Sequence, residues 1–131
     1  MNPLTNVTMT IPKGCDNAPR KKIVIDLIVA FLAGDGGTIR TNVSESAVWI
    51  NIATSEELRG VDQIVDRLDE NEQQLTDVEV SSVITHGKFA SIDGVVHYED
   101  DSALYFCEVL TFTSASNKGM VKEIKSYHLL K

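Results

Sequence analysis

The chain has 131 residues, of which 43% are hydrophobic and 24% are charged, a composition typical of one globular domain with a single core. Its formal charge of −7 argues against binding to nucleic acids or anionic membrane surfaces, because both require clustered lysine and arginine. The longest apolar stretch, residues 23–33, rises about 16 Å as a helix, which covers only about half of a bilayer core.

Two further features bear on where the protein resides. Met1 to Thr10 lacks the charged start and the apolar core of a signal peptide. The two cysteines, Cys15 and Cys107, match no metal or disulfide spacing, so we expect free, buried thiols in a reducing compartment. The sequence therefore predicts a cytoplasmic protein.

The first part of the chain is predicted to be mainly helical. Residues 1–15 are polar and extended in character and are predicted to form an N-terminal arm, followed by a single domain over residues 16–131. The first helix begins near Pro19, which suits a first turn, and ends at the glycine-rich residues 34–37. One stripe at helical spacing marks its buried face: Ile23, Leu27, Ala30 and Phe31.

A strand is expected between the second and third helices. A short second helix is predicted at residues 38–43, and residues 47–52 are β-branched and aromatic, which indicates a strand. Thr54 to Glu57 has the spacing of a helix capping box. Because Gly60 interrupts that segment, the third helix is placed at residues 61–70.

From residue 76 onward the hydrophobic pattern changes to the period of two that is typical of strands. Gly87 is interpreted as a bulge within the first long strand, and Asp93-Gly94 as a two-residue hairpin turn. Four strands are expected in this meander, at residues 76–92, 95–98, 103–113 and 120–130. Helices followed by strands indicate the α+β class, with three N-terminal helices packed on a curved antiparallel sheet.

Four short motifs occur in order along residues 16–131. They are Ala30-x-x-x-Gly34-Asp35 at the end of the first helix, Val48-Trp49 in the first strand, Arg59-Gly60 before the third helix, and Phe106 to Phe112 followed by a charged strand ending in Ser126-Tyr127. In these motifs the chain resembles the nuclear transport factor 2-like superfamily, which includes ketosteroid isomerases and SnoaL-like polyketide cyclases. Ile11 to Cys15 and Ile84 to Lys88 are similar to a bacterial subgroup of it.

The resemblance implies a cone-shaped α+β barrel. In this fold a strongly curved sheet wraps around the first helix, and the open end of the cone admits a small hydrophobic molecule. Most relatives are homodimers through the outer face of the sheet. No cofactor is expected from the resemblance.

Ketosteroid isomerases use a helix-borne tyrosine, an aspartate after the first strand as the base, and a protonated acid on a late strand. On this sequence the tyrosine position falls at Leu27, and the base position falls at Ile50, with Asn51 next to it. Only the acid on the late strand has a counterpart with the same kind of side chain, Glu108. The resemblance therefore implies the fold without the isomerase reaction.

Glu108 is the most informative single residue. Strand alternation places it on one face with four large apolar side chains: Leu104, Phe106, Leu110 and Phe112. A carboxylate there must be neutral or have a partner. It is either a structural group satisfied by a neighbour or by a dimer partner, or a pocket group that binds or protonates a ligand. His128, which shares a face with Ile124 and Ser126, is its candidate partner, although a solvated histidine near a strand end fits the pattern equally.

The predicted pocket combines these positions. Its lining is expected to be Leu27, Phe31, Trp49, Asn51, His86, Phe106, Leu110, Ile124 and Ser126, with Glu108 and His128 as the candidate catalytic residues. His86 is included because it precedes the predicted bulge, although a histidine satisfied by backbone fits that position too. His97 is expected on the surface, and three scattered histidines predict no metal site.

Two functions fit this pocket. One is a lyase-, cyclase- or isomerase-type enzyme that binds a small hydrophobic molecule and uses Glu108 as acid and base. The other is a non-catalytic, dimeric binding or accessory protein of the same fold. A protein-interaction module is a third class, but nothing in the sequence marks a peptide groove.

Overall fold

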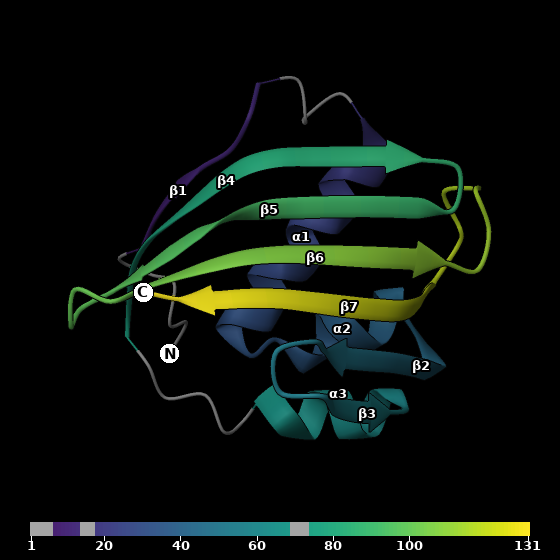
Figure 1. The fold of residues 1–131 in the computed structure, drawn as a ribbon. Coiled ribbons are helices and arrows are strands. Elements are labelled where there is room, and N and C mark those ends of the chain that lie inside the picture. The colour runs from purple at the N-terminus through teal and green to yellow at the C-terminus, as the bar shows by residue number, and fades with distance from the viewer. Residues whose placement is uncertain (1–6, 14–17, 69–73) are drawn as a thin grey trace.

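The computed structural model describes residues 7–13, 18–68 and 74–131, and within these ranges it contains three helices and a seven-stranded sheet (Figure 1). The helices are α1 (Pro19–Ala33), α2 (Gly36–Asn42) and α3 (Val61–Leu68). The strands are β1 (Thr8–Thr10), β2 (Val43–Asn51), β3 (Glu56–Arg59), β4 (Leu75–His86), β5 (Phe89–Tyr98), β6 (Ala103–Phe112) and β7 (Val121–Leu130). The predicted α+β class is confirmed.

The hydrophobic core lies between α1 and the inner face of the sheet. Figure 1 shows α1 behind the curved strands β4 to β7. Leu27 of α1 and Ile92, Leu110 and Phe112 of the strands are almost wholly excluded from solvent in one apolar cluster. The helix ends at Gly34, which adopts the left-handed conformation that glycine tolerates, with φ of 70°.

The sheet is mixed, whereas the sequence pattern predicts an antiparallel one. Its strand order is β1-β4-β5-β6-β7-β2-β3, and β4 to β7 form the expected antiparallel meander. Two pairs are parallel: β1 with β4, and β2 with β7. Both join segments that are far apart in the chain, and local sequence patterns carry no information on such pairings. Part of the predicted arm, Thr8–Thr10, thus extends the sheet.

The predicted hairpin at Asp93-Gly94 is wrong, because β5 runs straight through these residues. The turn lies at Gly87-Lys88 instead, where Gly87 has φ of 59°. A β-carbon on Gly94 would lie 2.1 Å from the carbonyl oxygen of Glu79, beside an irregularity in the β4–β5 pairing. Glycine is therefore needed here for a close approach of two strands and not for a turn.

The predicted capping box at Thr54 to Glu57 is also wrong. Glu56 and Glu57 belong to β3, which forms an antiparallel hairpin with β2 and places Leu58 opposite Trp49. α3 starts at Val61 as predicted, and residues 69–70 of the predicted helix lie outside the described residues. Cross-strand pairing thus prevails over a weak local helix signal.

α2 begins with a side-chain cap. The side chain of Asp35 caps α2 by accepting from the Thr38 hydroxyl and backbone amide, and these bonds lower the pKa of Asp35.

Cys107 is a half-buried free thiol whose pKa is raised by burial, and then by the Asp93 and Glu108 carboxylates. Cys15 lies outside the described residues. Within the described ranges, no helix is long and apolar enough to cross a membrane.

Candidate functional site

A cavity of about 350 Å³ opens between α1, the β2–β3 hairpin and the inner faces of β6 and β7. Most of its wall is apolar. The apolar lining consists of Ile28, Phe31, Leu32, Trp49, Leu58, Leu68, Val96, Tyr98, Leu104, Phe106, Leu110 and Ile124. The remaining lining residues are polar or charged: Asn51, Glu56, Arg67, Glu108, Ser126 and His128.

Four of the lining side chains form a continuous hydrogen-bonded chain. The indole Nε1 of Trp49 lies 2.7 Å from Ser126 Oγ, which in turn is hydrogen-bonded to Glu108 Oε2. The other carboxylate oxygen, Glu108 Oε1, lies 2.6 Å from His128 Nε2. The wall of the cavity therefore contains one connected polar cluster, Trp49–Ser126–Glu108–His128.

Strand register brings these residues together. Glu108 of β6 is the direct partner of Ser126 of β7, and His128 lies two residues further along β7, on the same face. Trp49 of β2 is paired with Ile124, so it also lies within reach of Ser126. Three separate strands thus supply the cluster.

The direction of the hydrogen bonds follows from the chemistry of the donors. An indole N–H can only donate, so Ser126 accepts from Trp49 and its own proton points to Glu108. Glu108 Oε2 is therefore an acceptor, and Glu108 Oε1 shares a single proton with His128 Nε2. The proton resides on the imidazole or on the carboxyl group, and the Glu108–His128 pair can hold or release it.

Glu108 and His128 differ in how far they are exposed to solvent. Glu108 is 7% exposed and Ser126 is wholly buried, whereas 24% of the His128 side chain is accessible. Both carboxylate oxygens of Glu108 already have partners within the chain. A molecule in the cavity consequently meets the imidazole of His128 more readily than the carboxylate of Glu108.

Nine of the eleven predicted site residues line this cavity, and two do not. Leu27 lies one helical turn before Phe31 and is fully buried in the core, so it supports the cavity without contributing to its wall. His86 is exposed at the end of β4, where the strand turns at Gly87 and does not bulge toward a site. Leu27 and His86, which were predicted to line the pocket, are therefore not among the residues that line this cavity.

Sequence reasoning missed several lining residues. Ile28 lies three residues before Phe31 and four before Leu32, and this helical spacing could have been used to find them. Glu56 and Arg67, whose side chains are 3.3 Å apart, come from β3 and α3. No local pattern links those two residues, because the hairpin that brings Glu56 to the cavity was not predicted.

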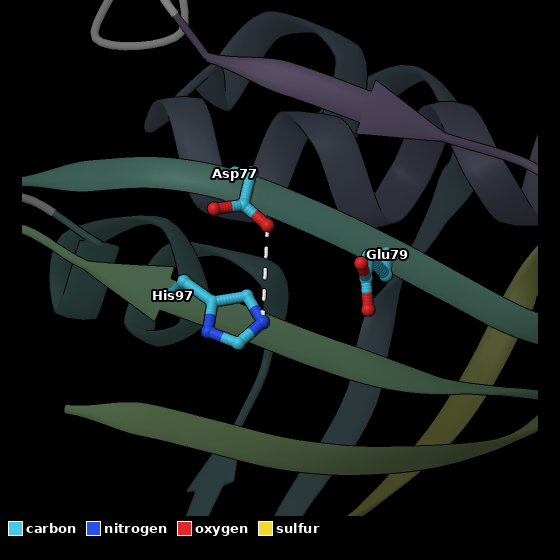
Figure 2. A group of neighbouring side chains, drawn as sticks. All are labelled: Asp77, Glu79 and His97. Carbon is cyan, nitrogen blue, oxygen red and sulfur yellow. Dashed lines mark ion pairs between the residues drawn. The ribbon is translucent and has the colours of Figure 1, made fainter. Parts of the chain in front are cut away.

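A second cluster of titratable side chains lies outside the cavity. Asp77, Glu79 and His97 stand close together on β4 and β5, and they form the one group in the described ranges whose ligand atoms are placed to hold a metal ion (Figure 2). His97, which the sequence predicts to lie on the surface, has 38% of its side chain exposed.

The sequence matches no protein-family model and no curated protein. Solved structures do match in fold. An NTF-2-like protein of unknown function from Burkholderia xenovorans LB400 superposes with a TM-score of 0.71 and 15% identity, covering 88% of this chain and 86% of the other. A candidate SnoaL-like polyketide cyclase from Shewanella denitrificans OS-217 gives a TM-score of 0.72 and 16% identity, covering 86% of this chain and 91% of the other.

A third match is a hypothetical protein with a ketosteroid isomerase-like fold from Catenulispora acidiphila DSM 44928, solved in complex with trimethylamine. Its TM-score is 0.62 and its identity 16%, over 81% of this chain and 84% of the other. The chain has the nuclear transport factor 2-like fold. At these identities the likeness establishes the fold alone.

In this nuclear transport factor 2-like fold, two positions that the resemblance assigns to the isomerase reaction hold apolar residues. Leu27, at the position that the resemblance predicts for the tyrosine donor, is buried in the core. Ile50, at the position that the resemblance predicts for the base, is not among the residues that line the cavity, whereas its neighbour Asn51 is. Glu108 and His128, by contrast, are titratable residues that line the cavity and contact each other.

Proposed function

We propose that this domain binds a small, mostly apolar molecule in the cavity, with a polar group of that molecule directed at His128. The observation that carries the proposal is an apolar cavity of about 350 Å³ with a carboxylate–imidazole pair in its wall. This volume falls at the lower end of the range typical of small-molecule sites, which are mainly apolar with a few polar groups that fix orientation.

The polar cluster also indicates what kind of group is bound. Within this cluster, Ser126 is hydrogen-bonded to Glu108, so the more accessible imidazole of His128 is the group that can exchange a hydrogen bond with a ligand. A carbonyl or hydroxyl on an apolar body fits both requirements. The trimethylamine complex of the Catenulispora acidiphila protein supports small-molecule binding by this fold.

Binding can be measured through Trp49, which is the only tryptophan and lines the cavity. We expect 2-tetralone, a small apolar ketone, to change the fluorescence of Trp49 saturably. Leu104→Phe adds volume inside the cavity and is expected to weaken binding at least about tenfold. The matched control is Ile84→Phe, at an exposed site on β4, which should bind as the wild type does. Equal affinities of the two variants would contradict the proposed site.

The Glu108–His128 pair favours a second proposal, that the bound molecule undergoes acid–base chemistry. A carboxylate that orients an imidazole is a common arrangement for proton transfer. In such a step the pair takes a proton from the carbon next to a carbonyl, the electron pair moves to the carbonyl oxygen, and the proton is then returned. A lyase, cyclase or isomerase reaction can begin in this way.

Proton transfer is tested by hydrogen–deuterium exchange of the α-protons of 2-tetralone in D₂O, followed by proton NMR. We expect the wild type to accelerate exchange about a hundredfold or more over buffer. Glu108→Gln and His128→Gln should lose most of this acceleration, because each removes one half of the pair. His86→Gln, outside the cavity, is the control. Binding without any acceleration would support the non-catalytic alternative, a binding or accessory protein.

We also propose that the chain forms a homodimer through the outer face of the sheet. Tyr105, Tyr127 and Leu129 form an apolar patch there, around a shallow hollow that Cys107 also lines. Leu129 is 57% exposed, and a patch of this kind on a sheet face is typical of an interaction surface. The two strands that carry the patch, β6 and β7, are adjacent and antiparallel.

Sedimentation velocity tests the dimer. We expect the wild type to be dimeric at micromolar concentration, and Leu129→Lys to be monomeric because it places a charge within the patch. Ile84→Lys introduces the same charge at an exposed apolar position outside the patch and should remain dimeric. A monomeric wild type, or a dimeric Leu129→Lys variant, would rule out this interface.

A cytoplasmic location and the absence of nucleic-acid binding complete the proposal. The free thiol of Cys107 supports a reducing compartment. The formal charge of −7 disfavours contact with phosphate backbones.

A further inference from the structure

We propose that Asp77, Glu79 and His97 bind a divalent transition-metal ion on the outer face of the sheet. The two carboxylates are alternate residues of β4, so they project from the same face. Val78 and Val80 on the other face are buried, which places both carboxylates outside the core. Figure 2 shows them beside the imidazole of His97, which belongs to the neighbouring strand β5.

The distances between the ligand atoms suit a shared ion. His97 is the direct cross-strand partner of Asp77, and its Nε2 lies 3.8 Å from Asp77 Oδ2. One ligand atom from each of the three residues lies within 4.8 Å of the other two. Around zinc, with bonds of about 2.0–2.2 Å, ligand atoms are roughly 3.3 Å apart. The three side chains are partly or fully exposed, so small rotations close this gap without moving the strands.

The charges around the cluster favour a cation. Asp77 and Glu79 carry like charges on neighbouring same-face positions, which repel each other. In the part of the chain that the structure describes, His97 is the only basic partner of Asp77, and the side chain of Glu79 has neither an ion pair nor a hydrogen bond. The Thr76 hydroxyl donates to Asp77 Oδ1 over 3.1 Å, which orients the carboxylate and leaves Oδ2 facing the histidine.

The kind of metal follows from the donor set. Calcium and magnesium prefer oxygen ligands alone, whereas an imidazole with two carboxylates suits zinc and similar transition metals. Three protein ligands leave at least one coordination position open to water or to a further ligand. Spacings along the chain predict no metal site. This cluster is assembled across two strands by their register.

Calorimetric titration of the full chain with zinc chloride tests the proposal. We expect one saturable site per chain in the wild type, and at least about a tenfold loss of affinity in each of Asp77→Asn, Glu79→Gln and His97→Gln. His86→Gln replaces an exposed histidine outside the cluster, as a matched control, and should bind zinc as the wild type does. This control separates the site from adventitious binding to histidine.

A second measurement locates the ion without any substitution. Substoichiometric Mn²⁺ should broaden the ring resonances of His97 in the wild type before those of His86 and His128. Two results would overturn the proposal: no saturable zinc binding up to about 1 mM, or zinc affinity that persists in all three cluster variants. Selective broadening of another histidine would overturn it as well.

Discussion

Replacement of Gly94 by alanine is expected to lower the free energy of unfolding by at least about 3 kcal/mol, the upper end of the usual cost of overpacking. An added β-carbon would lie 2.1 Å from the carbonyl oxygen of Glu79 and 3.0 Å from the Cα of Val80. Both neighbours are backbone atoms, so no side-chain rotation can relieve the clash. β4 and β5 would have to separate near the middle of the length over which they are paired.

Gly37→Ala is the matched control for this substitution. Gly37 lies in the first turn of α2, and the nearest atom to an added β-carbon is Asp35 Oδ1 at 3.5 Å, an ordinary contact. Alanine favours helix over glycine by up to about 1 kcal/mol, so this variant should be as stable as the wild type or slightly more stable. Urea unfolding followed by circular dichroism measures both. A Gly94→Ala variant as stable as the Gly37→Ala variant would refute the described approach of β4 and β5.

Leu27→Ala is expected to lower the free energy of unfolding by about 2–5 kcal/mol. Leu27 is fully buried in the middle of α1, among the largest wholly excluded side chains of the described residues. Truncation removes apolar contacts and leaves a void that the helix and sheet cannot fully close. The void would lie beneath the cavity wall, one turn from Phe31.

Leu130→Ala serves as the control for Leu27→Ala, because it makes the same truncation at a site that is 63% exposed. We expect a change within about 0.5 kcal/mol there. Chemical denaturation of both variants provides the comparison. A loss below about 1 kcal/mol for Leu27→Ala would mean that this face of α1 packs against solvent or a large empty space, and that the described core is incorrect.

The parts of the fold that the sequence predicts well rest on short-range signals. The period of α1, its termination at Gly34 and the start of α3 at Val61 are all encoded within a few residues. Alternation along β6 placed Glu108 on the inner face, and that alternation is a local property of any strand. The partner of Glu108 could be anticipated because β6 and β7 are consecutive.

The parts that the sequence does not predict depend on long-range pairing. Asp93-Gly94 is a residue pair typical of turns. In the structure, however, Gly94 lies within a strand, where a glycine is needed because the backbone of Glu79 in the neighbouring strand approaches it closely. The spacing of Thr54 to Glu57 predicts a helix cap, although Glu56 pairs with Asn51 across a hairpin and lines the cavity. His97 meets Asp77 only through the register of β4 and β5. In each case a tertiary contact decides between local options.

The central claim is that a small apolar molecule binds in the cavity beside His128, and NMR chemical-shift mapping with 2-tetralone tests it most directly. The chain has one indole N–H, that of Trp49, which is hydrogen-bonded to Ser126 within the cavity wall. We predict that the ketone shifts this indole signal and the His128 ring signals together, with one binding curve. Shifts confined to Tyr105, Tyr127 and Leu129 on the outer face, with the Trp49 indole unchanged, would contradict the account.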